Sequence, residues 1–302
     1  MPYIEDMKTR GTSAFDELHQ DVNRIIFTDF PDHANVGDSA IALGQQAYWD
    51  SKSVEVAKTF SATVLPTEVF ASHEPVFIHG GGNFGGLYPP LSEHRYRLAE
   101  ALRPETLLIQ GAQSVHFVDS HAYAEFKARM ASRPSLRVAV RDLESFELLR
   151  PHVPNLILSP DAVHFLGPIA SLEPTQKRVY LSRTDAESSV PAGQGSVDWG
   201  RDSIDLLVPW WFSLRCKQIP AMKPMFNRSN TWWMSKAEKR FLRGVEILSR
   251  GETVVTDRLH AMLIALQMGR KVVARDSNNK KLSRYAATWF GDSPPEGLSW
   301  ER

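Results

Sequence analysis

Short apolar segments alternate with longer stretches of helical pattern along most of this chain, and this alternation constrains its fold most strongly. Repeated strand–helix–strand units pack as an α/β fold, because each connecting helix returns the chain to the same edge of a mainly parallel sheet. We therefore predict an α/β fold of two Rossmann-like domains whose mainly parallel sheets face each other across a cleft. The expected strands are Arg24–Thr28, Pro75–His79, Thr106–Gln110, Leu136–Val140, Leu156–Leu158, Arg178–Ser182, Ile204–Val208, Thr253–Thr256 and Lys271–Ala274, and the expected helices of the first half are Ser39–Ser51, Ser92–Leu102, His121–Ser132 and Leu143–Arg150.

Chain length and one irregular segment indicate two domains. The chain has 302 residues, and one domain typically takes roughly 150. The segment 167–177 (GPIASLEPTQK) contains two prolines and little apolar periodicity, so we place the boundary there. We expect an N-terminal domain over residues 1–168 and a C-terminal domain over residues 175–302. Ligands of such folds bind at the carboxyl ends of the strands.

One helix of the second half has recognisable ends. Ser235 and Glu238 match a capping box, which predicts the start of a helix. Gly251 stands where a glycine commonly ends a helix. We therefore expect a helix between these two points.

Charge balance and the single cysteine exclude several classes of protein. The chain holds 35 Lys and Arg residues against 35 Asp and Glu residues. Nucleic acid is therefore not an expected partner, because binding it needs an excess of positive charge. Cys216 is the only cysteine, which excludes an intramolecular disulfide and Cys-rich metal sites. The first residues lack the apolar stretch of a signal peptide and no apolar run is long enough to span a membrane, so we expect a cytoplasmic protein.

The first candidate site is FTDFPDHANVGDSAIALG, which predicts a strand, a loop and a helix. Asn35, Gly37 and Asp38 stand where the chain enters the helix, and backbone N–H groups at such a point favour an anion. Asn and Asp are also common there as helix caps. The segment is therefore either a phosphate or carboxylate site or a simple cap.

The second candidate is VFIHGGGNFGGLYPP, in which Gly80, Gly82 and Gly85 satisfy GxGxxG. The dinucleotide-binding fingerprint needs a helix to open within the motif, whereas Tyr88 and the two following prolines predict irregular chain until about Ser92. The glycines instead indicate close approach of the backbone to a ligand or to a neighbouring helix. His79 before them is either a ligand-facing residue or a hydrogen-bonded structural histidine.

The third candidate is TVVTDRLHAMLIALQMGRKVV, a compact strand, turn, helix and strand. Arg258 and His260 fall at the carboxyl end of the strand and the start of the helix, where charge and N–H groups converge on one point. We interpret this as a carboxylate or phosphate site. The alternative is a surface pair of Asp257 with Arg258 and a helix cap at His260.

Weaker signals stand at the ends of other strands. Gln110, Gln113 and Ser114, then Arg141 with Asp142, then Arg183 with Asp185, follow predicted strands and could line the cleft or form caps and surface pairs. The spacing of His, Asp and Glu matches no zinc motif, and no GxSxG is present, so we expect no metal and no serine nucleophile of that type. Two aromatic clusters, Trp210-Trp211-Phe212 and Trp232-Trp233, are either core or stacking surface for a sugar or a partner chain.

Several segments, taken in chain order, resemble the polysaccharide pyruvyl transferase family. They are NVGDSAI (35–41), HGGGNFGGLYP (79–89), QSV (113–115), RDLES (141–145), SPD (159–161), SRTD (182–185) and TDRLHAMLIALQMG (256–269). The resemblance implies two Rossmann-like domains in a GT-B-like arrangement, of which the C-terminal domain (175–302) would bind the donor. It also implies transfer of pyruvate from phosphoenolpyruvate to two hydroxyls of a sugar, which forms a cyclic ketal.

The resemblance also assigns residues. Arg183, Arg258 and His260 match the family's basic motif residues and would bind the phosphate and carboxylate of the donor. The other residues expected at the donor or substrate are Asn35, Gly37, Gly81, Gly82, Asn83, Gln113 and Ser114. The family often has an acid after GNFG where this chain has Gly86, so either Asp38 or Asp142 takes over its role or the position is not essential.

The chemistry of ketal formation suggests two catalytic roles. His260 is our candidate general acid, because an imidazole titrates near neutral pH, and Asp38 is our candidate base.

Phosphoenolpyruvate would be a co-substrate, and we expect no cofactor and no metal. The acceptor would be a sugar or a lipid-linked oligosaccharide, and the latter would bring the protein into peripheral contact with the inner face of the membrane. The alternatives are a nucleotide-sugar glycosyltransferase of GT-B type and a non-catalytic anion- or sugar-binding protein.

Overall fold

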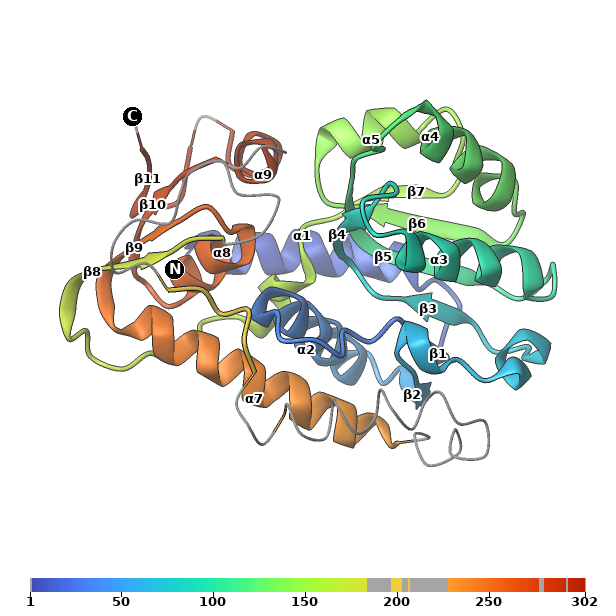
Figure 1. The fold of residues 1–302 in the computed structure, drawn as a ribbon, viewed down its shortest axis with the longest axis horizontal. Helices are drawn as coiled ribbons and strands as arrows, with labels where there is room; N and C mark the ends of the chain where they lie inside the picture. Colours follow the sequence, from blue (N-terminus) through green and yellow to red (C-terminus); the bar gives the residue numbers. More distant parts are fainter. Residues whose placement is uncertain are drawn as a thin grey trace.

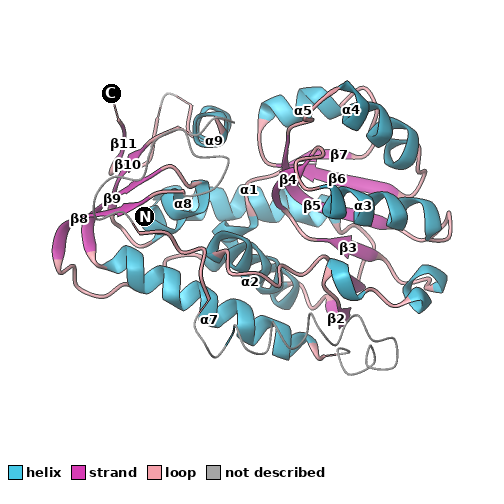
Figure 2. Ribbon diagram, in the orientation of Figure 1, coloured by secondary structure: helices cyan, strands magenta, loops and turns pink. Residues whose placement is uncertain are grey.

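The computed structural model describes residues 2–183, 197–202, 206, 228–276, 280–291 and 293–301, and it contains two parallel β-sheets (Figures 1 and 2). The first sheet has the order β2-β1-β3-β5-β6-β7, with β4 paired to β5, and the second has the order β11-β10-β9-β8. Every registered pair of neighbouring strands is parallel. The strands of the first sheet are β1 Arg24–Thr28, β2 Glu55–Thr59, β3 Val76–Ile78, β4 Gly81–Phe84, β5 Leu108–Val115, β6 Leu136–Val140 and β7 Leu156–Leu158, and those of the second are β8 Gln176–Leu181, β9 Gly251–Thr256, β10 Lys271–Ala274 and β11 Leu298–Trp300. The predicted fold class is confirmed.

Helices connect the strands and cover both sheets, as the alternating sequence pattern predicts. They are α1 Pro2–Leu18, α2 Val36–Ser51, α3 Pro89–Ala101, α4 Ser120–Phe126, α5 Leu143–Leu149, α7 Asn230–Ser249, α8 Leu259–Gln267 and α9 Lys281–Trp289. A π-helical turn, Lys127–Ala131, extends α4, and short 3₁₀ turns lie at Ala62–Val64, Thr67–Ala71 and Ala162–Leu166. Among the described residues, none of these helices is both long and apolar enough to cross a bilayer.

Two helices join the cores of the two sheets. Val36 and Ala40 of α2 are buried in the apolar cluster of the second sheet, whereas Trp233 and Ala237 of α7 are buried in a cluster of the first sheet. Figure 1 shows α2 and α7 side by side, and the approach is close enough that a Cβ on Gly244 would lie 2.3 Å from Val36 Cγ1. The two halves are therefore packed into one body around α2 and α7. The domain boundary at residues 167–177 stays a prediction.

Several predicted element ends are wrong for identifiable reasons. Ser229, not Ser235, caps α7 by accepting a hydrogen bond from Trp232 N, so Ser235 lies inside the helix. Gly251 is the first residue of β9 and not a helix cap. Helix α3 begins at Pro89 rather than near Ser92, because proline is well tolerated in a first helical turn. Strand β5 continues past Gln110 to Val115 and carries Gln113 and Ser114 within the sheet.

Some elements were missed or cannot be compared. Helices α1 and α9 and strands β2, β4 and β11 have no counterpart among the predicted elements. The strand predicted at Ile204–Val208 lies outside the described residues, apart from one helical residue, Leu206. The cluster Trp210-Trp211-Phe212 also lies outside them.

Candidate functional site

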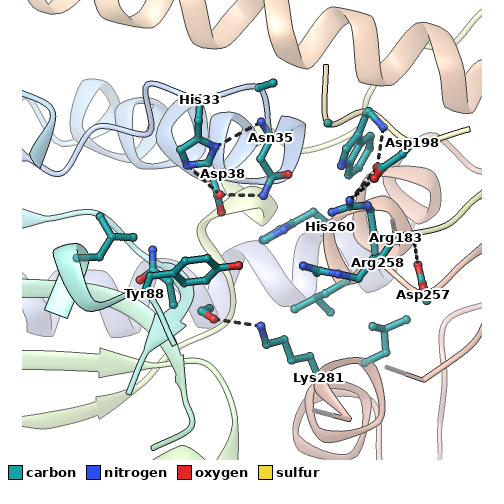
Figure 3. Close-up of a pocket in the computed structure, with 18 of the residues that line it drawn as sticks. His33, Asn35, Asp38, Tyr88, Arg183, Asp198, Asp257, Arg258, His260 and Lys281 are labelled. Carbon is teal, nitrogen blue, oxygen red and sulfur yellow. Dashed lines mark hydrogen bonds and ion pairs between the residues drawn. The ribbon is translucent and has the colours of Figure 1, made fainter. Parts of the chain in front are cut away.

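A cavity of about 490 Å³ lies between the two sheets, lined by residues that follow strands of both. This is the position where open parallel sheets bind ligands. From the first-sheet side come, among others, Asn35, Asp38, Gly82, Asn83, Tyr88 and Arg141. From the second-sheet side come, among others, Arg183, Asp198, Asp257, Arg258, His260 and Lys281 (Figure 3).

The start of α2 forms one edge of the cavity. Its first residues form a helix cap and also line the cavity. Asn35 caps the helix, because its side-chain oxygen accepts a hydrogen bond from Gly37 N at 3.0 Å. The amide of the same side chain donates to Asp38 Oδ2 at 2.8 Å, and His33 Nε2 lies 3.4 Å from that oxygen. Burial would raise the pKa of Asp38, but the imidazoles of His33 and His260 outweigh it and hold this pKa below its usual value. Asp38 is therefore an ionised carboxylate that lines the cavity.

The turn between β9 and α8 forms the opposite edge. Asp257 Oδ1 accepts a hydrogen bond from Arg183 N at 2.9 Å, which joins this turn to the end of β8. Arg258 Nη2 donates to Asp198 Oδ2 at 2.8 Å. Asp257 and Arg258 are both buried, so the alternative of a surface pair between them is wrong. The structure instead places Arg183 and Arg258 together in the cavity wall, next to the N-terminus of α8.

His260, in the first turn of α8, is enclosed by groups of the first-sheet side. Its Nε2 lies 3.2 Å from Arg141 Nη1 and 3.3 Å from Asp161 Oδ2, and these two partners are joined by an ion pair of 2.5 Å. The other ring nitrogen faces Gly37, where an added Cβ would lie 2.3 Å from His260 Nδ1. The glycine is thus required for space, because any side chain at position 37 would overlap the imidazole.

Asp161 and Arg141 are almost completely enclosed, with side chains 1% and 2% exposed. Burial would raise the pKa of Asp161, but His260 and Arg141 outweigh it and hold this pKa well below its usual range. Asp161 Oδ1 also accepts from Val163 N at 3.0 Å, and Arg141 Nε donates to Ser114 Oγ at 2.9 Å. Ser114 therefore orients Arg141 from within the sheet and does not line the cavity.

The glycine-rich segment forms the short strand β4 rather than a nucleotide-binding turn. Gly81 adopts φ +136°, a backbone conformation that favours glycine. Asn83 N donates to Gln113 Oε1 at 3.3 Å, and Gln113 Nε2 donates to His79 O at 3.1 Å, so Gln113 supports the segment from behind. Lys281 Nζ of α9 reaches across the cavity to donate to Gly82 O at 3.0 Å.

Two further positions are structural. His79 Nδ1 lies 3.1 Å from Gln45 Oε1, and burial lowers the pKa of His79 to about 3, so it is a neutral core histidine. Gly86 has φ +98°, and its added Cβ would lie 3.0 Å from both Ala122 Cβ and Val118 Cγ2. An acid at position 86 would therefore meet a strained backbone and close contacts with both neighbours.

The predicted site residues therefore fall into two groups. Those that line the cavity are Asn35, Asp38, Gly82, Asn83, Arg183, Arg258 and His260. Those that lie behind it and support it are Gly37, Gly81, Gln113 and Ser114. Of the tryptophan pair, Trp233 is core, 3% exposed and packed on Phe30 with ring centroids 4.9 Å apart. Within the described residues, no group of three His, Cys, Asp or Glu side chains is placed to hold a metal ion.

Sequence reasoning missed three contributors to the cavity. Tyr88 was interpreted only as part of an irregular loop, and Lys281 belongs to a helix without a recognisable motif. Asp198 was not singled out, although it pairs with Arg258. Asp161 beneath the cavity did carry a signal, because it ends the segment SPD.

The chain is similar to known proteins over most of its length. A family model described as polysaccharide pyruvyl transferase matches residues 14–279. Pyruvyl transferase 1 of Schizosaccharomyces pombe is 27% identical over 92% of this chain and 72% of its own length. EpsO of Bacillus subtilis, provisionally named a pyruvyl transferase, is 23% identical over 91% of this chain and 88% of its own length. The crystal structure of a functionally uncharacterized protein from Klebsiella pneumoniae has the same fold, with a TM-score of 0.69 at 14% identity over 98% of this chain and 99% of that one.

Proposed function

The chain belongs to the polysaccharide pyruvyl transferase family, and we propose that it transfers pyruvate from phosphoenolpyruvate to a sugar of a surface or extracellular polysaccharide, or of its precursor. The product would be a cyclic pyruvate ketal. The observation that carries this proposal is the gathering of Arg183, Arg258, His260 and Lys281 around one cavity at the start of α8.

This arrangement suits a small donor with two anionic groups. Phosphoenolpyruvate has a phosphate and a carboxylate, which guanidinium groups bind through charge-assisted hydrogen bonds. A helix N-terminus adds backbone N–H groups and a favourable dipole. Arg183, Arg258 and the N-terminus of α8 would therefore hold the donor on the second-sheet side of the cavity.

The reaction requires proton transfer at two places. His260 would protonate the methylene carbon of the donor, which leaves an oxocarbenium-like centre at the neighbouring carbon. One sugar hydroxyl attacks that centre, phosphate leaves with the electron pair of its C–O bond, and the second hydroxyl closes the ring. Of the two hydroxyl protons released, one restores the imidazolium and the other passes to Asp38 or to the departing phosphate. The lowered pKa of Asp38 makes it a weak base, so its role would depend on its position beside the acceptor.

The first-sheet side of the cavity fits an acceptor sugar. Asp38 and Asn83 offer oxygen and nitrogen atoms for hydroxyl groups. Tyr88, which is 42% exposed, directs its ring into the cavity (Figure 3). Aromatic rings provide an apolar face with a polar tip. We therefore assign this side to the acceptor.

The proposal is tested by measuring phosphate release from phosphoenolpyruvate in the presence of a crude acceptor fraction from the host's polysaccharide pathway. His260→Ala should lower turnover by roughly 10²- to 10⁴-fold, the usual range for a lost general acid. Arg258→Ala should mainly raise the KM for the donor. Near-normal turnover in His260→Ala would contradict the acid role, and an unchanged donor KM in Arg258→Ala would contradict the donor site.

Matched variants and a ligand screen complete the test. His121→Ala removes an exposed histidine of α4 far from the cavity and should leave turnover unchanged. Thermal stabilisation by phosphoenolpyruvate but not by UDP or GDP would support pyruvyl transfer. Stabilisation by the nucleotides instead would favour a glycosyltransferase, and donor binding without any phosphate release would favour a non-catalytic protein.

A further inference from the structure

The Nε2 atom of His260 has two partners of opposite charge at almost equal distance. Arg141 Nη1 lies 3.2 Å away and Asp161 Oδ2 lies 3.3 Å away. An arginine can only donate a hydrogen bond and a carboxylate can only accept one. The same ring nitrogen therefore cannot bond to both partners in one protonation state.

Both partners are held in place independently of His260. Asp161 accepts from Val163 N at the start of the turn Ala162–Leu166, and its backbone N donates to Tyr285 Oη at 3.1 Å. Arg141 is oriented by Ser114 and by its ion pair with Asp161. Buried side chains with several fixed partners lose little further freedom when they bond to the imidazole.

We propose that Asp161 and Arg141 form a two-state support for His260, in which Asp161 accepts the Nε2–H of the imidazolium and Arg141 donates to Nε2 of the neutral ring. Each protonation state then has one hydrogen bond to the pair, and no side chain has to move when the proton leaves. Asp161 and Arg141 are positioning residues for His260 in this scheme. Its catalytic consequence rests on the proposed function: the pair would hold the imidazole in one orientation in both protonation states, so that the ring stays preorganised beside the donor.

Other groups around the ring are compatible with this arrangement. Asp38 of α2 interacts electrostatically with His260 and favours the imidazolium. His164 of the 3₁₀ turn also faces it, but burial lowers the pKa of His164 to about 4, so it adds no charge near neutral pH. Arg258 stands two residues before His260 at the start of α8, and its guanidinium pairs with Asp198. Asp161 is the carboxylate in hydrogen-bond range of Nε2.

The direct test is NMR titration of the histidine ring protons in the whole chain, with the His260 signal assigned by its loss in His260→Gln. Asp161→Asn should lower the titration midpoint of His260 by about 1 to 3 pH units, because an opposite charge at this distance is lost. Arg141→Gln should raise the midpoint. Asp202→Asn, which removes a carboxylate paired with two arginines away from His260, should leave it unchanged. A midpoint that does not move in Asp161→Asn would overturn the proposal.

A second measurement needs no variant at these two positions. In wild-type protein above the titration midpoint, ¹⁵N shifts of His260 should show the proton on Nδ1, because Nε2 accepts from Arg141. A neutral ring protonated at Nε2 would overturn the proposal even if the variants do not fold. Neither NMR result depends on phosphate release, so failure of this inference and failure of the proposed function are distinguishable.

Discussion

Two clusters of arginines, lysine and aspartates lie between the same two sheets, and they use similar residues for different purposes. The seam cluster consists of Asp32, Asp202, Lys236, Arg240 and Arg243, where α7 meets the first-sheet side. The pocket cluster consists of Arg141, Asp161, Arg183, Arg258, His260 and Lys281. One cluster closes the joint between the halves, and the other lines a cavity.

The difference lies in whether the cations border a cavity, since cations of both clusters have protein acceptors. In the seam cluster, Arg240 donates to both oxygens of Asp202 and to Pro31 O, and Arg243 donates to Asp202, Ala34 O and Trp199 O. In the pocket cluster, Arg183 and Arg258 reach a cavity of about 490 Å³ that can admit an anion. Charge that is enclosed by protein acceptors supports the fold, whereas charge beside a cavity can serve a ligand.

The largest expected effect is a loss of folding stability at acid pH, caused by buried histidines that belong to neither cluster. Burial lowers the pKa of His79 and His94 to about 3, and that of His19 and His164 to about 4. Each folded-state pKa lies below the unfolded value, so this stability is present above about pH 6.5 and is lost as the pH falls. Asp29 opposes the trend, because burial raises its pKa to about 7, and burial also raises the pKa of Asp257.

With roughly 1.4 kcal/mol per pH unit for each group, four histidines against Asp29 leave a net loss of at most about 4 kcal/mol per pH unit below pH 6.5, and the raised pKa of Asp257 reduces this loss. The lowered pKa values of Asp161 and Asp202 keep both clusters ionised in this range. Urea unfolding between pH 7 and pH 5 measures the effect. A flat stability curve down to pH 5 would show that the buried histidines do not control it.

The next largest effect is expected from the seam cluster. Asp202→Asn should destabilise the fold by about 3 kcal/mol, because it leaves the fully buried Arg240 without its main counter-charge. Folded enzyme should still bind the donor. Denaturant unfolding and donor titration of the same sample separate the two properties.

An exposed pair provides the control for this variant. Glu246→Gln breaks the ion pair with Arg250 on the surface of α7 and should change stability by less than about 0.5 kcal/mol. If Asp202→Asn were equally mild, the seam cluster would not be the closed structural joint that the comparison describes.

Gly37→Ala should have the smallest effect on stability of these three changes but a large effect on activity. Gly37→Ala places a Cβ 2.3 Å from His260 Nδ1, and such overpacking costs about 1–3 kcal/mol. Turnover should fall sharply, because the imidazole must move away from Arg141 and Asp161. Phosphate release, measured well below the melting temperature, checks this.

Gly251→Ala is the matched control. Its Cβ would lie 2.8 Å from Thr253 O and Val179 N, at the end of β9 opposite the cavity. It should lower stability to a similar degree but retain turnover per folded molecule. Equal losses of turnover in both variants would mean that Gly37 contributes only to folding.

Sequence patterns predicted the elements that depend on local chemistry. Strands β1, β6, β7 and β10 have the predicted bounds, because each is a short, mainly apolar segment between polar or turn residues. The turn before α8 was also correctly placed. The predicted start of α7 was wrong, because Ser229 and Ser235 both have capping chemistry. Tertiary contacts of the first turn, which include Trp233 on Phe30 and Asn230 with Gln46, favour the earlier start.

The sequence by itself determined the alternation of strands and helices, the family and the basic residues that follow the strands, because these are encoded in short segments. Tertiary structure decided which residues meet. Gly37 and His260 are far apart in the chain, yet the space left by the missing side chain seats the imidazole. Arg141, Asp161 and His260 likewise come from three separate segments and meet only because strand ends of two sheets face one cavity. Contacts of this kind depend on distances in space, which short segments of sequence do not specify.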